Sequence, residues 1–282
     1  MKFITSALLA ISAVSAAIIA PRQDASQDQT QQIASQYPEG TNAGLVNGTW
    51  YVTGVTDDLW DMYEKLAQTM NIQLGCLQLN NTATSATSFD GLLSAFLTHT
   101  NNANVGVNAS LAGAFMLQAP DTNTNTSDRT LLWDVYGSSV YVNKDQWNQF
   151  TSEGQQQQQQ DGQQGDKDVG STTIPGFQPF QATVYSKLID SNAQPGTNDS
   201  TNFDTVFLWS SQMRFLNPNE YQKRAGEVFG VILSRDTYLE GDKFNQTVAL
   251  LPEAIAANNI SIVQLNDTCR TDNNDNNNQQ QQ

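Results

Sequence analysis

The chain offers few residues whose types and spacing suit catalysis. His99 is the only histidine, and Ser-His-Asp chemistry would need a serine and a carboxylate beside it. The sequence contains no Gly-x-Ser-x-Gly turn to present such a serine and no Gly-rich phosphate loop. Asp57 and Asp58 form a carboxylate pair, but they stand at the start of a predicted helix, where the helix dipole favours negative charge. The sequence therefore predicts a protein that is not an enzyme, with no catalytic residue, no metal and no cofactor.

The cysteines and asparagines carry more chemical information. Cys76 and Cys269 are too few and too far apart for a metal cluster or a redox pair, so in an oxidising compartment we expect one disulfide between them. The chain also contains eight Asn-x-Ser/Thr acceptor triplets for N-linked sugars. We expect about half of them to be used. The acceptor asparagines are Asn47, Asn80, Asn108, Asn125, Asn198, Asn245, Asn259 and Asn266.

The two ends of the chain indicate export. Residues 1–17 combine an early lysine, an apolar run and small residues at Ala16 and Ala17, which is typical of a secretory signal peptide. Residues 18–44 are rich in polar residues and predict a disordered leader, and residues 270–282 predict a disordered Asn/Gln-rich tail. No other stretch reaches the ~18 apolar residues that a spanning helix needs. We expect a secreted protein without integral membrane association, released or held in a wall or matrix.

Charge and length restrict the remaining classes. The formal net charge of −15 argues against binding to nucleic acid and to anionic membranes. Residues 45–269 are long enough for one sizeable domain, interrupted near 152–170 by a Gln-rich loop insertion. We interpret this insertion as a flexible loop, with an interaction tract as the alternative.

The pattern within this domain is that of an all-β fold. Short segments rich in β-branched and aromatic residues alternate with Asn, Gly, Ser and Pro. Two segments have helical spacing instead: residues 57–70, with Thr56 or Asp57 as its cap, and residues 241–259, which Pro252 must kink or split. The predicted strands are Trp50–Thr56, Leu74–Thr82, Leu92–His99, Val105–Gln118, Thr130–Tyr136, Ala182–Ile189, Val206–Gln212 and Val228–Ser234, with Ser139–Asn143 as a further candidate.

Four short motifs then follow one another in the order found in one family. Gly48-Thr49-Trp50-Tyr51 resembles the Gly-x-Trp element that opens the first lipocalin strand. Residues 75–80, GCLQLN, are similar to the Cys-x-Gln-x-Asn second strand of apolipoprotein D-like and bacterial lipocalins. Residues 201–204, TNFD, resemble the Thr-Asp-Tyr element before the seventh strand, and residues 229–235, FGVILSR, resemble the eighth strand with its final arginine. The chain departs from the family in the long segment between Trp50 and Cys76, in Asn202 and Phe203, and in the insertion from Val140 to Phe180.

The resemblance implies an eight-stranded antiparallel up-and-down barrel, with a C-terminal α-helix packed outside and a helical insertion between the first two strands. It also implies that Gly48, Trp50 and Arg235 close one end of the barrel, the arginine packing over the indole by a cation–π contact.

At the other end the resemblance implies a cup for a small hydrophobic ligand such as a lipid, a fatty acid or a sterol. Alternation along the strands sends every second side chain inward, and the helix of residues 57–70 either covers the mouth or packs on the outer wall. The inward side chains either line a cup or simply fill the core. The alternatives in function are a wall-associated structural or interaction glycoprotein without a ligand, and a lipocalin-fold enzyme. The candidate ligand-binding residues are Val52, Gly54, Leu77 and Leu79 on the strands and Leu59, Met62 and Leu66 on the helix.

Overall fold

The computed structural model describes residues 32–39, 41–100, 102–121, 124, 126, 129–153, 171–173, 180–190, 203–210, 228–252, 262–265 and 269. The predicted signal peptide, residues 18–31 of the leader, residues 154–170 of the Gln-rich insertion and the C-terminal tail lie outside these ranges.

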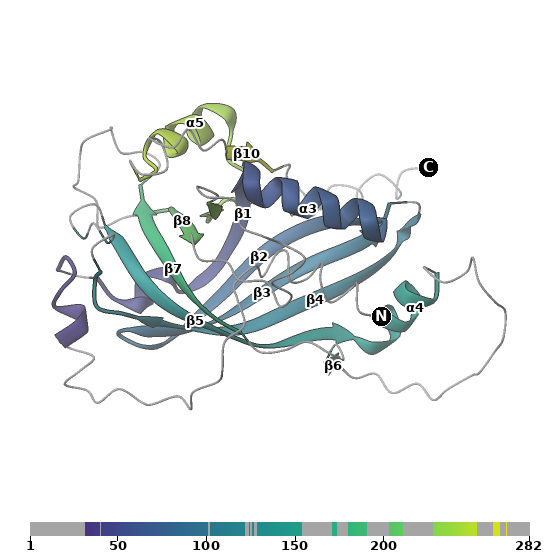
Figure 1. Cartoon of the computed structure of the whole chain (residues 1–282), viewed down its shortest axis with the longest axis horizontal. Coiled ribbons are helices and arrows are strands. Elements are labelled where there is room, and N and C mark those ends of the chain that lie inside the picture. Colours follow the sequence, from purple (N-terminus) through teal and green to yellow (C-terminus); the bar gives the residue numbers. More distant parts are fainter. Residues whose placement is uncertain are drawn as a thin grey trace, which may run out of the picture.

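Eight antiparallel strands close into a barrel, as predicted (Figure 1). Each strand pairs with the next along the chain, and the last returns to pair with the first, so that the sheet has no open side. The predicted strands all form, and the candidate strand Ser139–Asn143 is the second half of β5. The barrel strands are β1 (Gly48–Thr56), β2 (Ile72–Ser85), β3 (Ser88–His99), β4 (Asn102–Leu117), β5 (Thr130–Asn143), β7 (Phe180–Ile189), β8 (Thr205–Ser210) and β9 (Phe229–Ser234).

In the described part of the chain, the helices α3, α4 and α5 flank the barrel. α3 (Asp57–Met70) fills the predicted range between the first two strands, and in Figure 1 it runs beside β2 at the edge of the barrel. α5 (Gly241–Ala249) follows β9, packs on the outer surface and ends before Pro252. α4 (Lys144–Glu153) continues from β5 and was not predicted, and the short 3-10 helix η1 (Ala43–Val46) leads into β1.

β1 and β2 pair over only part of their lengths. β1 pairs with β2 from Gly48 to Tyr51, whereas its residues Gly54–Thr56 pair with a short unpredicted strand, β10 (Ile262–Gln264). A second unpredicted strand, β6 (Ser171–Thr173), pairs with β5. Leu265, directly after β10, donates its N–H to the Thr53 carbonyl at 3.0 Å. The C-terminal part of the chain therefore occupies the place where the first two strands part.

Among the described residues, buried apolar side chains form three clusters. The inner cluster lies on the concave face of the sheet and includes Trp50, Leu79, Phe89, Trp133 and Val184. The rim cluster continues this face toward the ends of the long strands, where α4 packs, and consists of Ile72, Leu97, Val107, Ala109, Leu111, Val140, Val142 and Phe150. The outer cluster lies between the barrel and α5 and consists of Ile189, Phe207, Val228, Ile232, Leu239, Phe244 and Leu251.

Part of the leader predicted to be disordered packs on the barrel. Residues 32–34 are helical, and Tyr37 and Ala43 are 6% and 0% exposed. The Tyr37 hydroxyl donates to the Gln118 carbonyl at 2.6 Å and accepts the Leu132 N–H at 3.2 Å. These residues are ordered because one aromatic ring enters the inner cluster and its hydroxyl satisfies two backbone groups.

Candidate functional site

One end of the barrel is closed by Trp50 and Arg235. The indole is fully buried, and its Nε1 donates to the Val46 carbonyl at 2.7 Å. The Arg235 guanidinium carbon lies 3.6 Å from the centroid of the indole. The same guanidinium donates to the carbonyls of Asn47 and Thr49 at 2.6 and 2.9 Å. Burial lowers the pKa of Arg235, because desolvation penalises the charged form.

Gly48 and the motif at 201–204 complete this end. Gly48 has φ +91°, and a side chain there would begin 3.1 Å from Arg235 Nη1, so glycine meets both the backbone and the spatial requirement. The Phe203 ring lies parallel to the Trp50 indole with the ring centroids 6.0 Å apart. Thr201 and Asn202 lie outside the described residues.

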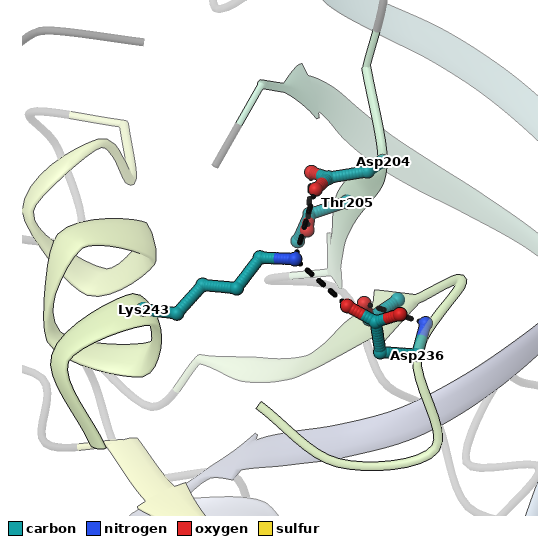
Figure 2. Close-up of polar contacts among 5 residues, drawn as sticks. Asp204, Thr205, Asp236 and Lys243 are labelled. Carbon is teal, nitrogen blue, oxygen red and sulfur yellow. Dashed lines mark hydrogen bonds and ion pairs between the residues drawn. The ribbon is translucent and has the colours of Figure 1, made fainter. Parts of the chain in front are cut away.

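A half-buried lysine of α5 lies between two carboxylates beside β8 and β9, as Figure 2 shows. Lys243 Nζ lies 3.1 Å from a carboxylate oxygen of Asp204 and 2.7 Å from one of Asp236, which flank β8 and β9. Thr205 Oγ1 donates to the other oxygen of Asp204 at 3.0 Å. Burial alone lowers the pKa of the ammonium, but the hydrogen bonds and charges of the two carboxylates raise it above its ordinary value. These contacts connect α5 to the residues that precede β8 and follow β9.

The concave face of the barrel is apolar and is only partly sealed. Val52, Leu77 and Leu79 are buried in the inner cluster. Alternation from an inward Trp50 predicted Val52, and alternation from an outward Cys76 predicted the two leucines. Leu93, in the middle of β3, and Phe115, near the end of β4, also pack against this cluster, yet both keep partial exposure. Leu74, Leu208 and Val231 share this combination. Solvent therefore reaches the inner wall at these side chains, and the alternation that located Leu79 would also have located Leu93 and Phe115.

Gly54 does not face the interior, which corrects the sequence-based prediction. The β1–β9 register shifts between Val52 and Gly54, so a bulge at this point reverses the alternation. A side chain on Gly54 would meet Phe244 at 2.9 Å and Ile232 at 3.2 Å, both in the outer cluster. The absence of a side chain at Gly54 thus lets Phe244 of α5 lie close against the barrel wall.

The apolar face of α3 packs into the barrel rather than on its outer wall. Leu59 and Met62 belong to the inner cluster; the side chain of Leu66 lies outside the described part of the structure. The Asp58 carboxylate accepts the Val228 N–H at 2.9 Å, and the Tyr63 hydroxyl accepts the Leu74 N–H at 2.9 Å. α3 is thus fastened to β2 and to the start of β9.

Thr56 occupies the N-cap position of α3 without capping it. Its hydroxyl donates to the Val228 carbonyl at 2.8 Å and accepts the Gly230 N–H at 3.0 Å. The side chain therefore joins β1 to β9 at the point where the helix begins.

Few polar groups interrupt the inner wall. The amide nitrogen of Asn81 donates to the Val46 carbonyl at 3.2 Å, and Trp133 Nε1 donates to Ser186 Oγ at 2.8 Å. Among the described residues, no Asp, Glu, Lys or Arg is buried. An ionised group inside the barrel would therefore lack a partner of opposite charge, so this interior suits an uncharged apolar molecule.

His99 has a packing role on the rim. Its ring stacks on Phe150 of α4 with the ring centroids 4.1 Å apart, and Nε2 lies 2.8 Å from the Phe150 carbonyl oxygen. In the ranges that the structure covers, no three His, Cys, Asp or Glu side chains lie together in a way that could hold a metal ion.

The disulfide between Cys76 and Cys269 is present, as predicted. It joins β2 to the segment after β10, and so fastens the C-terminal part of the chain where β1 and β2 separate.

The structure describes half of the predicted glycosylation sites. Asn47, Asn80, Asn108 and Asn245 are all exposed. Asn125, Asn198, Asn259 and Asn266 lie outside the described residues.

No family model and no curated protein matches this chain. None of the helices that the structure describes is both long and apolar enough to cross a membrane. The proposed function therefore rests on the fold and on the geometry of the barrel interior.

Proposed function

We propose that the chain is a secreted glycoprotein of lipocalin type that binds a small, uncharged, hydrophobic ligand inside its barrel. The observation that carries this proposal is the partial exposure of Leu93, which lies in the middle of β3 on the concave wall. A barrel whose interior is completely filled by its own side chains would bury it. An eight-stranded barrel has an interior of the size that holds either packed side chains or one small molecule.

The two ends of the barrel have different roles in this proposal. The end at Trp50 is closed by hydrogen bonds and by the cation–π contact of Arg235. At the opposite end, α3 covers the inner cluster with Leu59 and Met62. A ligand would reach Leu93 beside α3, and the absence of buried charge among the described residues favours a fatty alcohol, a sterol or a similar neutral lipid over a free carboxylate.

Two neighbouring leucines of β3 provide the test. Leu93 points into the barrel, whereas Leu92 lies on the outer face and is 40% exposed. Leu93→Phe adds volume to the interior, and we expect it to weaken binding of a fluorescent sterol or fatty-alcohol probe about tenfold or more, as a clash of about 1–3 kcal/mol requires. Leu92→Phe makes the same change on the outside and should leave the affinity unchanged.

Two results would contradict the proposal. One is wild-type protein that binds no member of a panel of fatty alcohols, fatty acids, sterols and retinoid-like probes and carries no lipid in native mass spectrometry. The other is an equal loss of affinity in both leucine variants. Secretion is tested separately by the mass of the exported protein, which should begin at residue 17 or 18.

A further inference from the structure

The outer wall of the barrel carries an exposed apolar surface. Four large hydrophobic residues of the described chain are conspicuously exposed, and three of them lie on the outer face of β3 and β5. We call these three the outer patch: Leu92, Phe96 and Tyr141, which are 40%, 38% and 38% exposed. Ser94 and Ser110, whose hydroxyls lie 2.9 Å apart, separate them. Covering these side chains would remove apolar surface from water, which is favourable.

Two predicted glycosylation sites lie within this patch. Asn80 of β2 pairs directly with Leu92, and Asn108 of β4 pairs directly with Phe96. Both asparagines are exposed. Side chains directly opposite each other on neighbouring antiparallel strands have Cβ atoms about 5 Å apart. A sugar on either amide nitrogen would therefore begin in contact range of an exposed apolar neighbour.

The third member of the patch lies on the next strand. Tyr141 pairs with Ser110, two residues along β4 from Asn108, so it occupies the diagonal position next to this asparagine. The Phe96 ring lies across β4 over Gly106, where a side chain would come within 2.2 Å of the ring. The absence of a side chain at Gly106 lets the ring lie over the wall, with its exposed surface beside Asn108.

We propose that N-linked glycans on Asn80 and Asn108 cover the outer patch, with the first sugar of each packing on Leu92 and on Phe96. The inference rests on the proposed function in one respect, export through the secretory pathway. There an oligosaccharide is transferred from a lipid pyrophosphate donor: the asparagine amide nitrogen forms a bond to sugar C1, the C1–O bond to pyrophosphate breaks, and the amide loses one proton. The apolar C–H face of the first sugar then shields each hydrophobic side chain from water.

Asn245 provides the matched control. It is an exposed acceptor on α5, and its neighbours Asp242 and Gln246 are exposed and polar. Asn80→Gln and Asn108→Gln should each lower the thermal midpoint of the exported full-length protein by about 3 °C and increase binding of an apolar dye. Asn245→Gln should change neither the midpoint nor the dye binding. Peptide mass mapping reports which of the three sites carry sugar.

Enzymatic trimming isolates the role of the first sugar. An endoglycosidase that leaves one N-acetylglucosamine on each asparagine should preserve the thermal midpoint. An amidase that removes both glycans, leaving aspartate at each site, should lower it to that of the Asn80→Gln/Asn108→Gln double variant. In a Phe96→Ser background, Asn108→Gln should cause no further change in the thermal midpoint, because the apolar partner of the Asn108 sugar is gone.

Three results would overturn the inference. They are unmodified Asn80 and Asn108 in the exported protein, glutamine variants that behave like Asn245→Gln, or equal destabilisation by trimming and by complete removal. Probe affinity measured on the same samples distinguishes this failure from that of the proposed function, because the outer patch and Leu93 lie on opposite faces of the sheet.

Discussion

Arg235 joins the first and last strands of the barrel through one side chain. Its two hydrogen bonds go to the carbonyls of Asn47 and Thr49, and its guanidinium lies over the buried indole of Trp50. These contacts use the planar fork and the charge of arginine together, so no other residue replaces it completely.

We therefore predict that Arg235→Met lowers the free energy of unfolding by about 2–3 kcal/mol, because it removes one cation–π contact and two hydrogen bonds. Arg235→Lys keeps the charge but not the fork, and should fall between Met and the wild type. Urea unfolding followed by tryptophan fluorescence measures both. Equal stability of the methionine variant and the wild type would contradict this role.

Tyr37 makes stability depend on alkaline pH. Burial raises the pKa of its phenol to about 12, although the hydrogen bond from the Leu132 N–H acts in the opposite direction. The native state thus holds the phenolic proton more tightly than the unfolded chain, in which the pKa is about 10. The stability that this proton contributes is complete below pH 10 and is lost as the pH rises from 10 towards 12.

Tyr37→Phe tests this assignment. At neutral pH we expect a loss of about 1–3 kcal/mol, because the Leu132 N–H and the Gln118 carbonyl lose their partner. Between pH 10 and 12, stability should fall less steeply in the variant than in the wild type. Urea midpoints at several pH values measure both effects, and parallel pH profiles would exclude Tyr37 as the source.

At the scale of elements, the contact between α5 and the barrel depends on Gly54. Gly54→Ala would place a methyl group 2.9 Å from the confined Phe244 ring, and we expect a destabilisation of about 1–2 kcal/mol. Gly241→Ala makes the same change at the start of α5, where no atom lies within 4 Å. This control should be neutral or slightly stabilising, since alanine favours helix. Thermal unfolding compares them, and equal effects would show that close packing is not the reason for Gly54.

The helices and strands that could be predicted from the sequence were those with a local residue pattern. Apolar spacing alone placed α3, and the alternation around Trp50 and Leu79 placed two strands of the wall. α4 was missed although Trp147 and Phe150 stand three residues apart, because the Gln-rich stretch that follows hides so short a signal. The leader offered a similar signal in Ile33 and Tyr37, which both pack on the inner cluster.

At the scale of the whole molecule, the features that sequence could not supply depend on distant partners. The bulge that turns Gly54 outward is set by pairing with β9, which lies far along the chain. β10 forms only where β1 and β2 part. The solvent access to Leu93 likewise depends on its neighbours on other strands, which include Leu79 and Leu111. Periodicity could find the inward face, but it could not show which positions on that face remain open.

The disulfide beside the separation of β1 and β2 has a mechanical consequence. Cys76 and Cys269 are 193 residues apart in sequence, and every strand from β3 to β9 lies between them. Tension applied to the two ends of the oxidised chain passes from Cys269 directly to Cys76, so only the segments before Cys76 and after Cys269 can be stretched. Most of the barrel is thus shielded from a pull on either end, whereas in the reduced chain the same pull can draw out every strand.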